Sequence, residues 1–291
     1  MRITVHADDL GATENVNQNI LSVWSAGALN SVSVIANGDA VEQAAAFTLQ
    51  DISRPLRIMV HLNLSEGKPL ADSHRVPLLV DANGRFHMGF IGLWRLWLKM
   101  NHVRRAEFLD QVEQEFTAQI ARINQLFYPR KASGVDGHIH IQMLPFLFPI
   151  AARLAARSGL NEIRISQEIF HFSPTDSLRP GYPANIIKHF LLNRLAGPAR
   201  QSAAQFGLVS PDSIAGVLYS GHMSRSSASA AIIATHKKHL NWLELIFHPG
   251  RAIASEMNRW PSQGSIGNFY ADPYRDTERD ELLLAGSSLQ Q

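Results

Sequence analysis

Strand-like and helix-like stretches alternate along this 291-residue chain, and this alternation most limits the folds that it can adopt. Short apolar stretches typical of buried strands are separated by segments with apolar residues at helical spacing. Parallel strands need a crossover connection of this kind, so the pattern predicts a mostly parallel sheet with helices packed on it. We expect an α/β fold, either a barrel or a doubly wound layer, and we favour a single barrel-like domain.

The expected elements cover most of the chain. The sequence contains no internal repeat and no low-complexity linker, so we predict a single domain over 1–291, with 66–106 and 168–235 as excursions from the barrel. The predicted strands are 2–9, 31–37, 57–64, 134–141, 162–166 and 241–250, and the predicted helices lie within 10–30 and at 39–50, 107–126 and 146–159.

Histidine and acidic residues follow several of these strands, and the chain contains no cysteine. The lack of cysteine excludes disulfides, iron–sulfur clusters and thiolate zinc sites, so any metal must be held by His, Asp or Glu. A barrel places its chemistry at the C-terminal ends of its strands. We therefore expect a metal site at that end of the barrel.

The charge and the hydropathy of the chain limit its possible binding partners and its cellular location. The chain has 27 basic and 25 acidic residues, a net charge of +2, which gives no sign of a general nucleic-acid partner. No stretch approaches the roughly 18 uninterrupted apolar residues of a membrane span. The start "MRITVHADDLG" lacks the apolar core of a signal peptide. We expect a cytoplasmic protein.

Two adjacent carboxylates, Asp8 and Asp9, end the first predicted strand. They repel each other, so their pKa values should separate unless a cation lies between them, and one can ligate a metal while the other serves as a base. A helix N-cap beside a solvated acid is the structural alternative. His61 also follows a buried apolar run, where a core histidine bonded to a backbone carbonyl is the alternative to a site residue.

The stretches "VDGHIHI" and "ELIFHPG" add three more histidines at strand ends. On a strand, residues two apart point to the same face, so His138 and His140 should converge with Asp136, which packing alone hardly explains. His248 stands either at a pocket rim or in a turn without a role. Only a shared pocket accounts economically for all these residues. One Asp and two His with open positions describe a hydrolytic metal site.

In this order, "HADDLG", "HLNLSEGKPL", "VDGHIHIQMLP" and "ELIFHPG" resemble the signature motifs of the YdjC-like carbohydrate deacetylases, the family that includes chitooligosaccharide deacetylase. Weaker similarities in "GALNSVSVIAN", "DANGRF", "SPDSIAGVLYSGHM" and "RDTERDEL" extend the resemblance over nearly the whole chain. The resemblance implies a modified (β/α) barrel. It also implies a metal-dependent hydrolase that removes an N-acetyl group from an amino sugar, in an oligosaccharide or a glycoconjugate, and releases acetate.

The resemblance further implies a role for each candidate residue. Asp9, His61 and His138 would bind a divalent ion, for which Mg, Zn, Mn and Co are all chemically suitable. Asp8 would be the general base that takes a proton from the attacking water. His248 would lie near the leaving group as a general acid or oxyanion stabiliser. The residues that would support the ligands or contact the sugar are Asp136, His140, Asn63 and Arg164.

Two other functions are compatible with parts of this pattern. Amidohydrolases and histidinol-phosphatase-like phosphoesterases also carry an HxH pair on a barrel strand, but usually on the first strand. A non-catalytic glycan- or lipid-linked-sugar-binding protein would have no need for both a base and metal ligands. The chain departs from the family pattern at Gln142, where members often carry a further histidine, and we expect this departure to bear on the sugar rather than on the chemistry.

The segment "FIGLWRLWLKMNHVRR" at 90–105 interleaves aromatic and basic residues. Trp94 and Trp97 are three residues apart and would share a helix face. Three interpretations stay open: a helix that packs on the barrel or on a homodimer partner, a lid that stacks on the sugar, and an interfacial helix that contacts anionic lipid. The last would imply a lipid-linked substrate.

Overall fold

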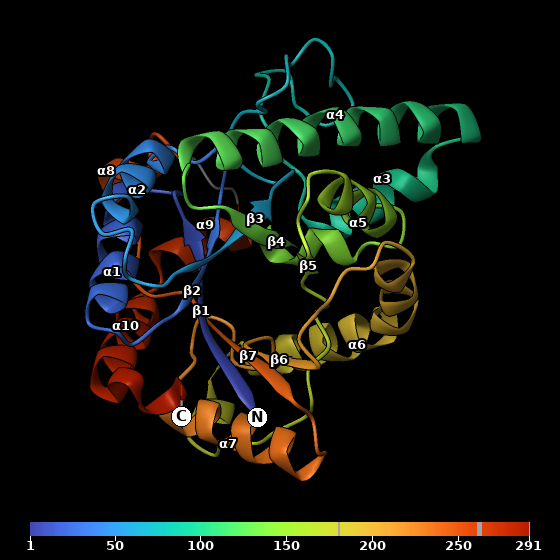
Figure 1. Cartoon of the computed structure of the whole chain (residues 1–291). Coiled ribbons are helices and arrows are strands. Elements are labelled where there is room, and N and C mark those ends of the chain that lie inside the picture. The colour runs from blue at the N-terminus through green and yellow to red at the C-terminus, as the bar shows by residue number, and fades with distance from the viewer. Residues whose placement is uncertain (180, 261–263, 291) are drawn as a thin grey trace.

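A computed structural model describes residues 1–179, 181–260 and 264–290. Its centre is one seven-stranded sheet in which all the paired strands run parallel, with the order β5-β4-β3-β2-β1-β7-β6 (Figure 1). The strands are β1 (Arg2–Leu10), β2 (Ser31–Val34), β3 (Arg57–Leu62), β4 (Ala132–Gly137), β5 (Glu162–Ile163), β6 (Ser213–Ala215) and β7 (Trp242–Phe247).

The sheet curls so that its two edges approach each other. Single parallel bridges join Glu162 to Val209 and Glu168 to Ile214, so the segment that follows β5 contacts β6 at the other edge. The prediction of an α/β, barrel-like fold with mostly parallel strands is confirmed. The predicted strand 162–166 is shorter than expected, and β6 was not predicted.

Helices cover the outside of the curled sheet (Figure 1). The helix predicted at 107–126 starts earlier, and its apolar residues Phe108, Val112, Phe116, Ile120 and Ile123 are buried as the helical spacing indicates. The helices are α1 (Glu14–Ser25), α2 (Val41–Thr48), α3 (Phe90–Lys99), α4 (His102–Leu126), α5 (Phe148–Arg157), α6 (Tyr182–Gln205), α7 (Arg225–Lys237), α8 (Ala254–Met257), α9 (Gly264–Ala271) and α10 (Tyr274–Ala285), with short 3₁₀ turns η1 (His138–Met143), η2 (Asp176–Leu178) and η3 (Gly286–Gln290).

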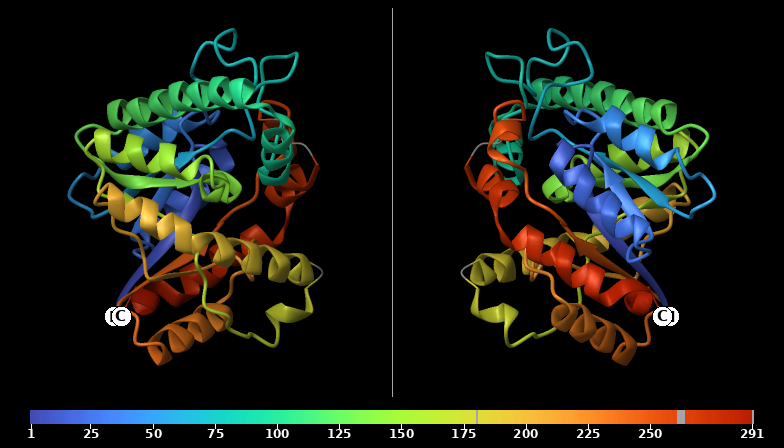
Figure 2. Two further views of the ribbon diagram at one scale, coloured as in Figure 1. Left: turned by 90° about the vertical axis from the view of Figure 1, so that its right-hand side faces the viewer. Right: turned by 90° about the vertical axis from the view of Figure 1, so that its left-hand side faces the viewer.

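The two ends of the barrel differ. Figure 2 shows that α3, α9 and η2 lie at the edge opposite to the two chain termini. Because β1 begins at Arg2, the edge with the termini is the N-terminal end of that strand. The opposite edge, with α3, α9 and η2, is therefore the end at which the strands deliver their C-terminal residues.

The expectation that a strand continues to residue 141 is wrong. β4 ends at Gly137, and the chain turns into η1, where Ile139 (φ 48°) and His140 (φ 61°) have left-handed backbone conformations. Such a φ is rare for a residue other than glycine and especially costly for β-branched isoleucine. His138 and His140 therefore do not share a strand face.

Candidate metal centre and reaction pocket

A bulge in β1 brings two neighbouring carboxylates to the same cavity. The pairing of β1 with β2 shifts register between Ala7 and Leu10, and Asp9 in between has a φ of 73°. In a regular strand, successive side chains point to opposite faces. Here Asp8 and Asp9 both line a cavity of about 540 Å³ at the C-terminal end of the barrel.

Asp9, His61 and His138 form a buried group in which one possible ligand atom of each lies within 4.8 Å of the others. Asp9 Oδ1 is 3.3 Å from His138 Nδ1 and 3.7 Å from His61 Nε2. They come from β1, β3 and the residue after β4. The three residues predicted as ligands are thus close together.

Each imidazole of this group has a carboxylate behind it. Asp136 Oδ1 is 2.8 Å from His61 Nδ1, a hydrogen bond that leaves Nε2 directed at the group. Glu66 Oε2 is 2.8 Å from His138 Nε2. Asn63 forms the turn that holds Glu66, since its side-chain oxygen accepts from the backbone N–H of Glu66 and its amide donates to the Glu66 carbonyl. Carboxylate partners of this kind are common behind metal-bound histidines.

The electrostatics of the group fit a divalent cation. Burial alone would raise the pKa of Asp9, but His138 and the Arg275 cation hold it well below its usual range. Although burial opposes it, Asp9 and Glu66 raise the pKa of His138 to about 10. Both oxygens of Glu66 and Nε2 of His138 are buried, and the contact between Oε2 and Nε2 is an ion pair without hydrogen-bond geometry. One carboxylate and two imidazoles around a concentration of negative charge suit a metal ion.

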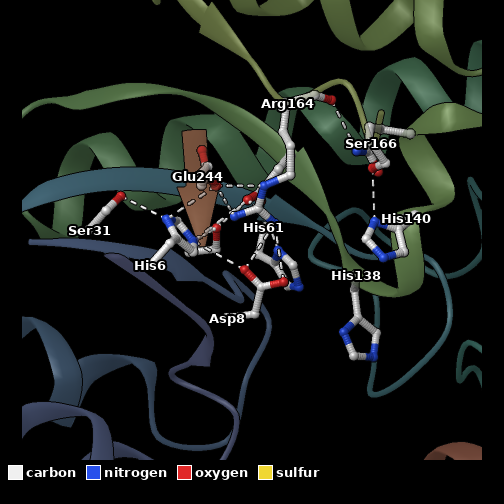
Figure 3. A network of polar contacts seen from close by, with 12 residues as sticks. His6, Asp8, Ser31, His61, His138, His140, Arg164, Ser166 and Glu244 are labelled. Atoms are coloured by element: carbon white, nitrogen blue, oxygen red, sulfur yellow. Dashed lines mark hydrogen bonds and ion pairs between the residues drawn. The ribbon is translucent and has the colours of Figure 1, made fainter. Parts of the chain in front are cut away.

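A second group of possible ligands, His6, Asp8 and Asp136, lies beside the first. Here the Arg164 guanidinium supplies the positive charge: its Nη1 is 2.9 Å from Asp8 Oδ1 and 2.8 Å from Asp136 Oδ2. Arg164 also contacts Glu244 on β7 (Figure 3). Against the effect of burial, this cation holds the pKa of Asp8 well below its usual range.

His248 directly follows β7, and its side chain lines the cavity next to the Asp8 carboxylate. Its Nε2 is 3.8 Å from Asp8 Oδ2, and its backbone N–H donates to Glu278. Burial lowers the pKa of His248 to about 3, so the imidazole is neutral at neutral pH. Burial also raises the pKa of Glu278 to about 8.

His140 and Gln142 differ from the expectation of a convergent ligand set. His140 lines the cavity, but its Nδ1 is hydrogen-bonded to Ser166 at 2.9 Å, away from His138 (Figure 3). Asp136 points to His61 and Arg164 instead of toward either histidine of the pair. Gln142 is fully buried and donates to the carbonyl of Arg164, so it does not face the cavity.

Sequence analysis missed several residues of this site. Arg275 on α10 is buried, and its Nη1 is 3.0 Å from Asp9 Oδ2. Glu66 supports His138, and Lys188 on α6 lines the cavity with a pKa that burial lowers to about 8. A signal existed for Arg275 and Glu66, because both lie in stretches that carry the family resemblance, "RDTERDEL" and "HLNLSEGKPL". Nothing in the sequence marked Lys188.

Comparison with known proteins identifies the family of the chain and a curated relative. The profile of the family described as YdjC-like protein matches residues 2–283. A chitooligosaccharide deacetylase from Serratia marcescens is 30% identical over 213 residues, which cover 69% of this chain and 77% of the relative.

A solved structure shares the fold. A crystal structure from Enterococcus faecalis V583, of a protein proposed to cleave cellobiose-phosphate, superposes with a TM-score of 0.67. The alignment covers 97% of this chain and 90% of that one at 21% identity. At this identity the likeness concerns the fold alone.

Proposed function

The chain belongs to the YdjC-like protein family, and from this premise we propose that it is a metal-dependent carbohydrate deacetylase. Its reaction would be the hydrolysis of the N-acetyl amide of an amino sugar, which releases acetate and the free amine. The observation that carries the proposal is the buried group Asp9, His61 and His138 in one cavity with the carboxylate of Asp8.

Amide hydrolysis needs a nucleophile at neutral pH and a place for negative charge. When bound by Asp9, His61 and His138, a divalent ion supplies both, since it lowers the pKa of a water molecule and polarises the acetyl carbonyl. Asp8 is the base that accepts the proton of the attacking water. The Arg164 cation keeps Asp8 ionised and fixes its direction, which supports this role.

His248 fits the stabilisation of the oxyanion better than the protonation of the leaving amine. With a pKa of about 3, the imidazole has no proton to give up at neutral pH, but its ring N–H can donate a hydrogen bond to the carbonyl oxygen as negative charge develops there. The leaving amine would then receive the proton that Asp8 took from water. One proton thus moves from water through Asp8 to the amine as the C–N bond breaks.

The remaining side chains of the cavity have positions suited to substrate contact. His140 is directed into the cavity from η1, and we assign it, with Lys188, to the binding of the sugar. The ligand set suits Zn, Co or Mn, and a water-rich version of it suits Mg. These roles rest on side-chain chemistry and on exposure to the cavity.

Acetate release across a panel of substrates tests the proposal. The panel contains N-acetylglucosamine oligomers, nucleotide-linked N-acetylglucosamine and lipid-linked N-acetylglucosamine, each with and without added metal. We expect acetate from at least one substrate, dependent on metal, and loss of release in His61→Ala but not in His236→Ala, an exposed histidine on α7. Phosphate release from phosphoesters in place of acetate release would contradict the proposal.

A further inference from the structure

Two long segments of the chain contain no acidic residue. Residues 82–106 and 177–211 carry nine of the 27 basic residues and none of the 25 acidic ones. The rest of the chain therefore has 18 basic and 25 acidic residues, a net charge of −7 against +9 in the two segments. The excess of basic over acidic residues is therefore confined to these two segments, although the total charge of +2 hides it.

The first segment contains α3, whose exposed face mixes apolar and basic residues. Ile91, Arg95, Leu98 and Lys99 are all exposed and follow helical spacing. Ile91 is 52% exposed. The tryptophans face the other way: Trp97 stacks on Phe146 with ring centroids 4.4 Å apart, so it contributes to packing.

The second segment presents a similar face on η2 and α6. Leu178 is 87% exposed, Ile187 72% and Phe190 63%. Arg194, one turn after Phe190, is exposed as well. Each of these side chains leaves a large apolar area in water, at a cost of about 25 cal/mol for each Å².

Both helices lie beside the cavity: α6 contributes to its lining, and α3 packs on η1, which also lines it. α3 and α6 each contact η1, the turn that carries His138 and His140. Ala184 and Lys188 of α6 line the cavity, while Ile187 and Phe190 of the same helix point outward. α3 and η2 lie at the same edge of the molecule (Figure 2). We call the eight exposed residues the mouth rim: Ile91, Arg95, Leu98 and Lys99 of α3, Leu178 of η2, and Ile187, Phe190 and Arg194 of α6.

We propose that the mouth rim docks on an anionic lipid bilayer and that the substrate is an N-acetylated amino sugar carried by a lipid anchor. The second half of this inference rests on the proposed deacetylase function. Apolar side chains at the rim would enter the headgroup region, and the basic side chains beside them would meet anionic lipid headgroups. The cavity would then open directly onto sugars at the bilayer surface.

The charge of the rim favours a bilayer over a second copy of the chain. Two copies that met rim to rim would bring like charges together, with no acidic residue in either segment to compensate. An anionic surface has the complementary charge. Among the described residues, none of the helices has the length and the apolarity of a membrane span.

Flotation of the full chain with vesicles tests the docking. The probes are vesicles of phosphatidylcholine alone and of phosphatidylcholine with about a third phosphatidylglycerol. We expect binding only to the anionic vesicles, with a decrease at high salt. Arg95→Gln should lower binding about fivefold, the effect of one cation near an anionic surface. Ile91→Glu and Ile187→Glu, which add a negative charge to an inserting position, should lower it more than Arg95→Gln does.

Matched control variants lie away from the mouth. Ile52, in the turn before β3, is 53% exposed, close to Ile91, and Leu284 on α10 is 69% exposed, close to Ile187. Ile52→Glu and Leu284→Glu should bind the anionic vesicles as the wild type does. Equal losses in control and rim variants, or no binding of the wild type, would overturn the docking. A wild-type dimer that rim variants convert to a monomer without vesicle binding would also overturn it, in favour of a second copy.

Acetate release separates this inference from the proposed function. In anionic vesicles with lipid-linked N-acetylglucosamine, release should fall in the rim variants in proportion to their binding and stay unchanged in the two control variants. A chain that binds vesicles but releases no acetate from any substrate refutes the deacetylase and keeps the docking. A chain that deacetylates soluble oligomers and does not bind vesicles refutes the docking and keeps the deacetylase.

Discussion

Asp8 and Asp9 are neighbours in the chain, both are buried, and each belongs to a group of histidine and carboxylate side chains, yet their surroundings differ in one respect. The cation next to Asp8 belongs to the protein, since Arg164 joins it to Asp136 and Glu244. Asp9 has Arg275 on one oxygen, while its other oxygen faces His61 and His138.

This difference decides what each group can do. A guanidinium cannot be deprotonated or exchanged in a protein, so the Asp8 group keeps a fixed charge and direction, as a base requires. Imidazoles can release protons and accept a metal, so the Asp9 group can exchange its cation. The two groups contain the same residue types, but Arg164 bridges the carboxylates of the Asp8 group, whereas Arg275 contacts one oxygen of Asp9 and leaves the other facing two imidazoles. We therefore expect the two groups to differ in function.

The largest expected effect separates the base from the ligands. Asp8→Asn should lower the rate of acetate release about 10²–10⁴-fold, since general base catalysis is lost, while the metal content of the purified protein stays close to that of the wild type. Asp9→Asn should lower both. Metal analysis and rate measurements on both variants test this, and an active Asp8→Asn variant would show that the base is another residue.

The two arginines should differ in their effect on stability. Arg164→Met removes the cation shared by Asp8, Asp136 and Glu244, of which Glu244 keeps a second one, Arg57, and should lower the free energy of unfolding by about 3–5 kcal/mol. Arg275→Met affects one carboxylate, Asp9, and added divalent metal should restore part of the loss, because the metal also neutralises that group. Urea unfolding with and without metal distinguishes them. Equal rescue of both variants by metal would remove the distinction between the two groups.

Metal removal should destabilise the protein through the Asp9 group alone. At a free metal concentration of 100 times the dissociation constant, binding stabilises the folded state by about 2.7 kcal/mol. A chelator should therefore lower the Tm of the wild type and of Asp8→Asn, each compared with the same protein containing metal. Asp9→Asn should show no decrease in Tm with the chelator. A decrease of similar size in that variant would show that the metal binds at another site.

A smaller effect concerns the pH dependence of stability and comes from Glu278, whose carboxylate lies next to His248 and not, like that of Asp8, against an arginine at 2.9 Å. Burial raises its pKa from 4.5 to about 8. The folded state thus binds a proton that the unfolded state loses above pH 4.5, so this group's contribution to stability decreases between about pH 4.5 and 8. Glu278→Gln does not titrate and should gain stability relative to the wild type over that range, by up to about 1.4 kcal/mol for each pH unit. Urea unfolding at several pH values measures the difference, and a constant difference would contradict the raised pKa.

The sequence allowed the barrel-like fold and a shared pocket of strand-end acids and histidines to be predicted, because alternation of strands and helices is local and parallel strands deliver their ends to one edge. The family resemblance, and not this pattern, selected Asp9, His61 and His138 from those residues. It did not allow the turn at Ile139 and His140 to be predicted, since the apolar alternation of "GHIHI" favours a strand. Whether the group binds a metal stays a prediction.

The sequence patterns also did not predict contacts between residues that are far apart in the chain. Arg275 meets Asp9 across 266 positions, and Arg164 meets Asp8 across 156. Neither contact follows from periodicity, because each depends on how the last helix and the β5 edge fold back onto β1. The charge segregation of 82–106 and 177–211 was present in the sequence, but only the fold brings α3 and α6 of the two segments into contact with the same turn, η1.

The bulge at Asp9 makes the spacing between the proposed base, Asp8, and the proposed metal ligand, Asp9, a property of a single peptide unit. The Cα atoms of Asp8 and Asp9 are linked by one rigid amide, whose length of about 3.8 Å does not change when strands shift. His61 lies on β3 and His138 directly follows β4, so both move with those strands. Mutations that shift the strands relative to one another should therefore change the distances from Asp9 to the two histidines, and with them the metal affinity. The distance between Asp8 and Asp9 should change much less.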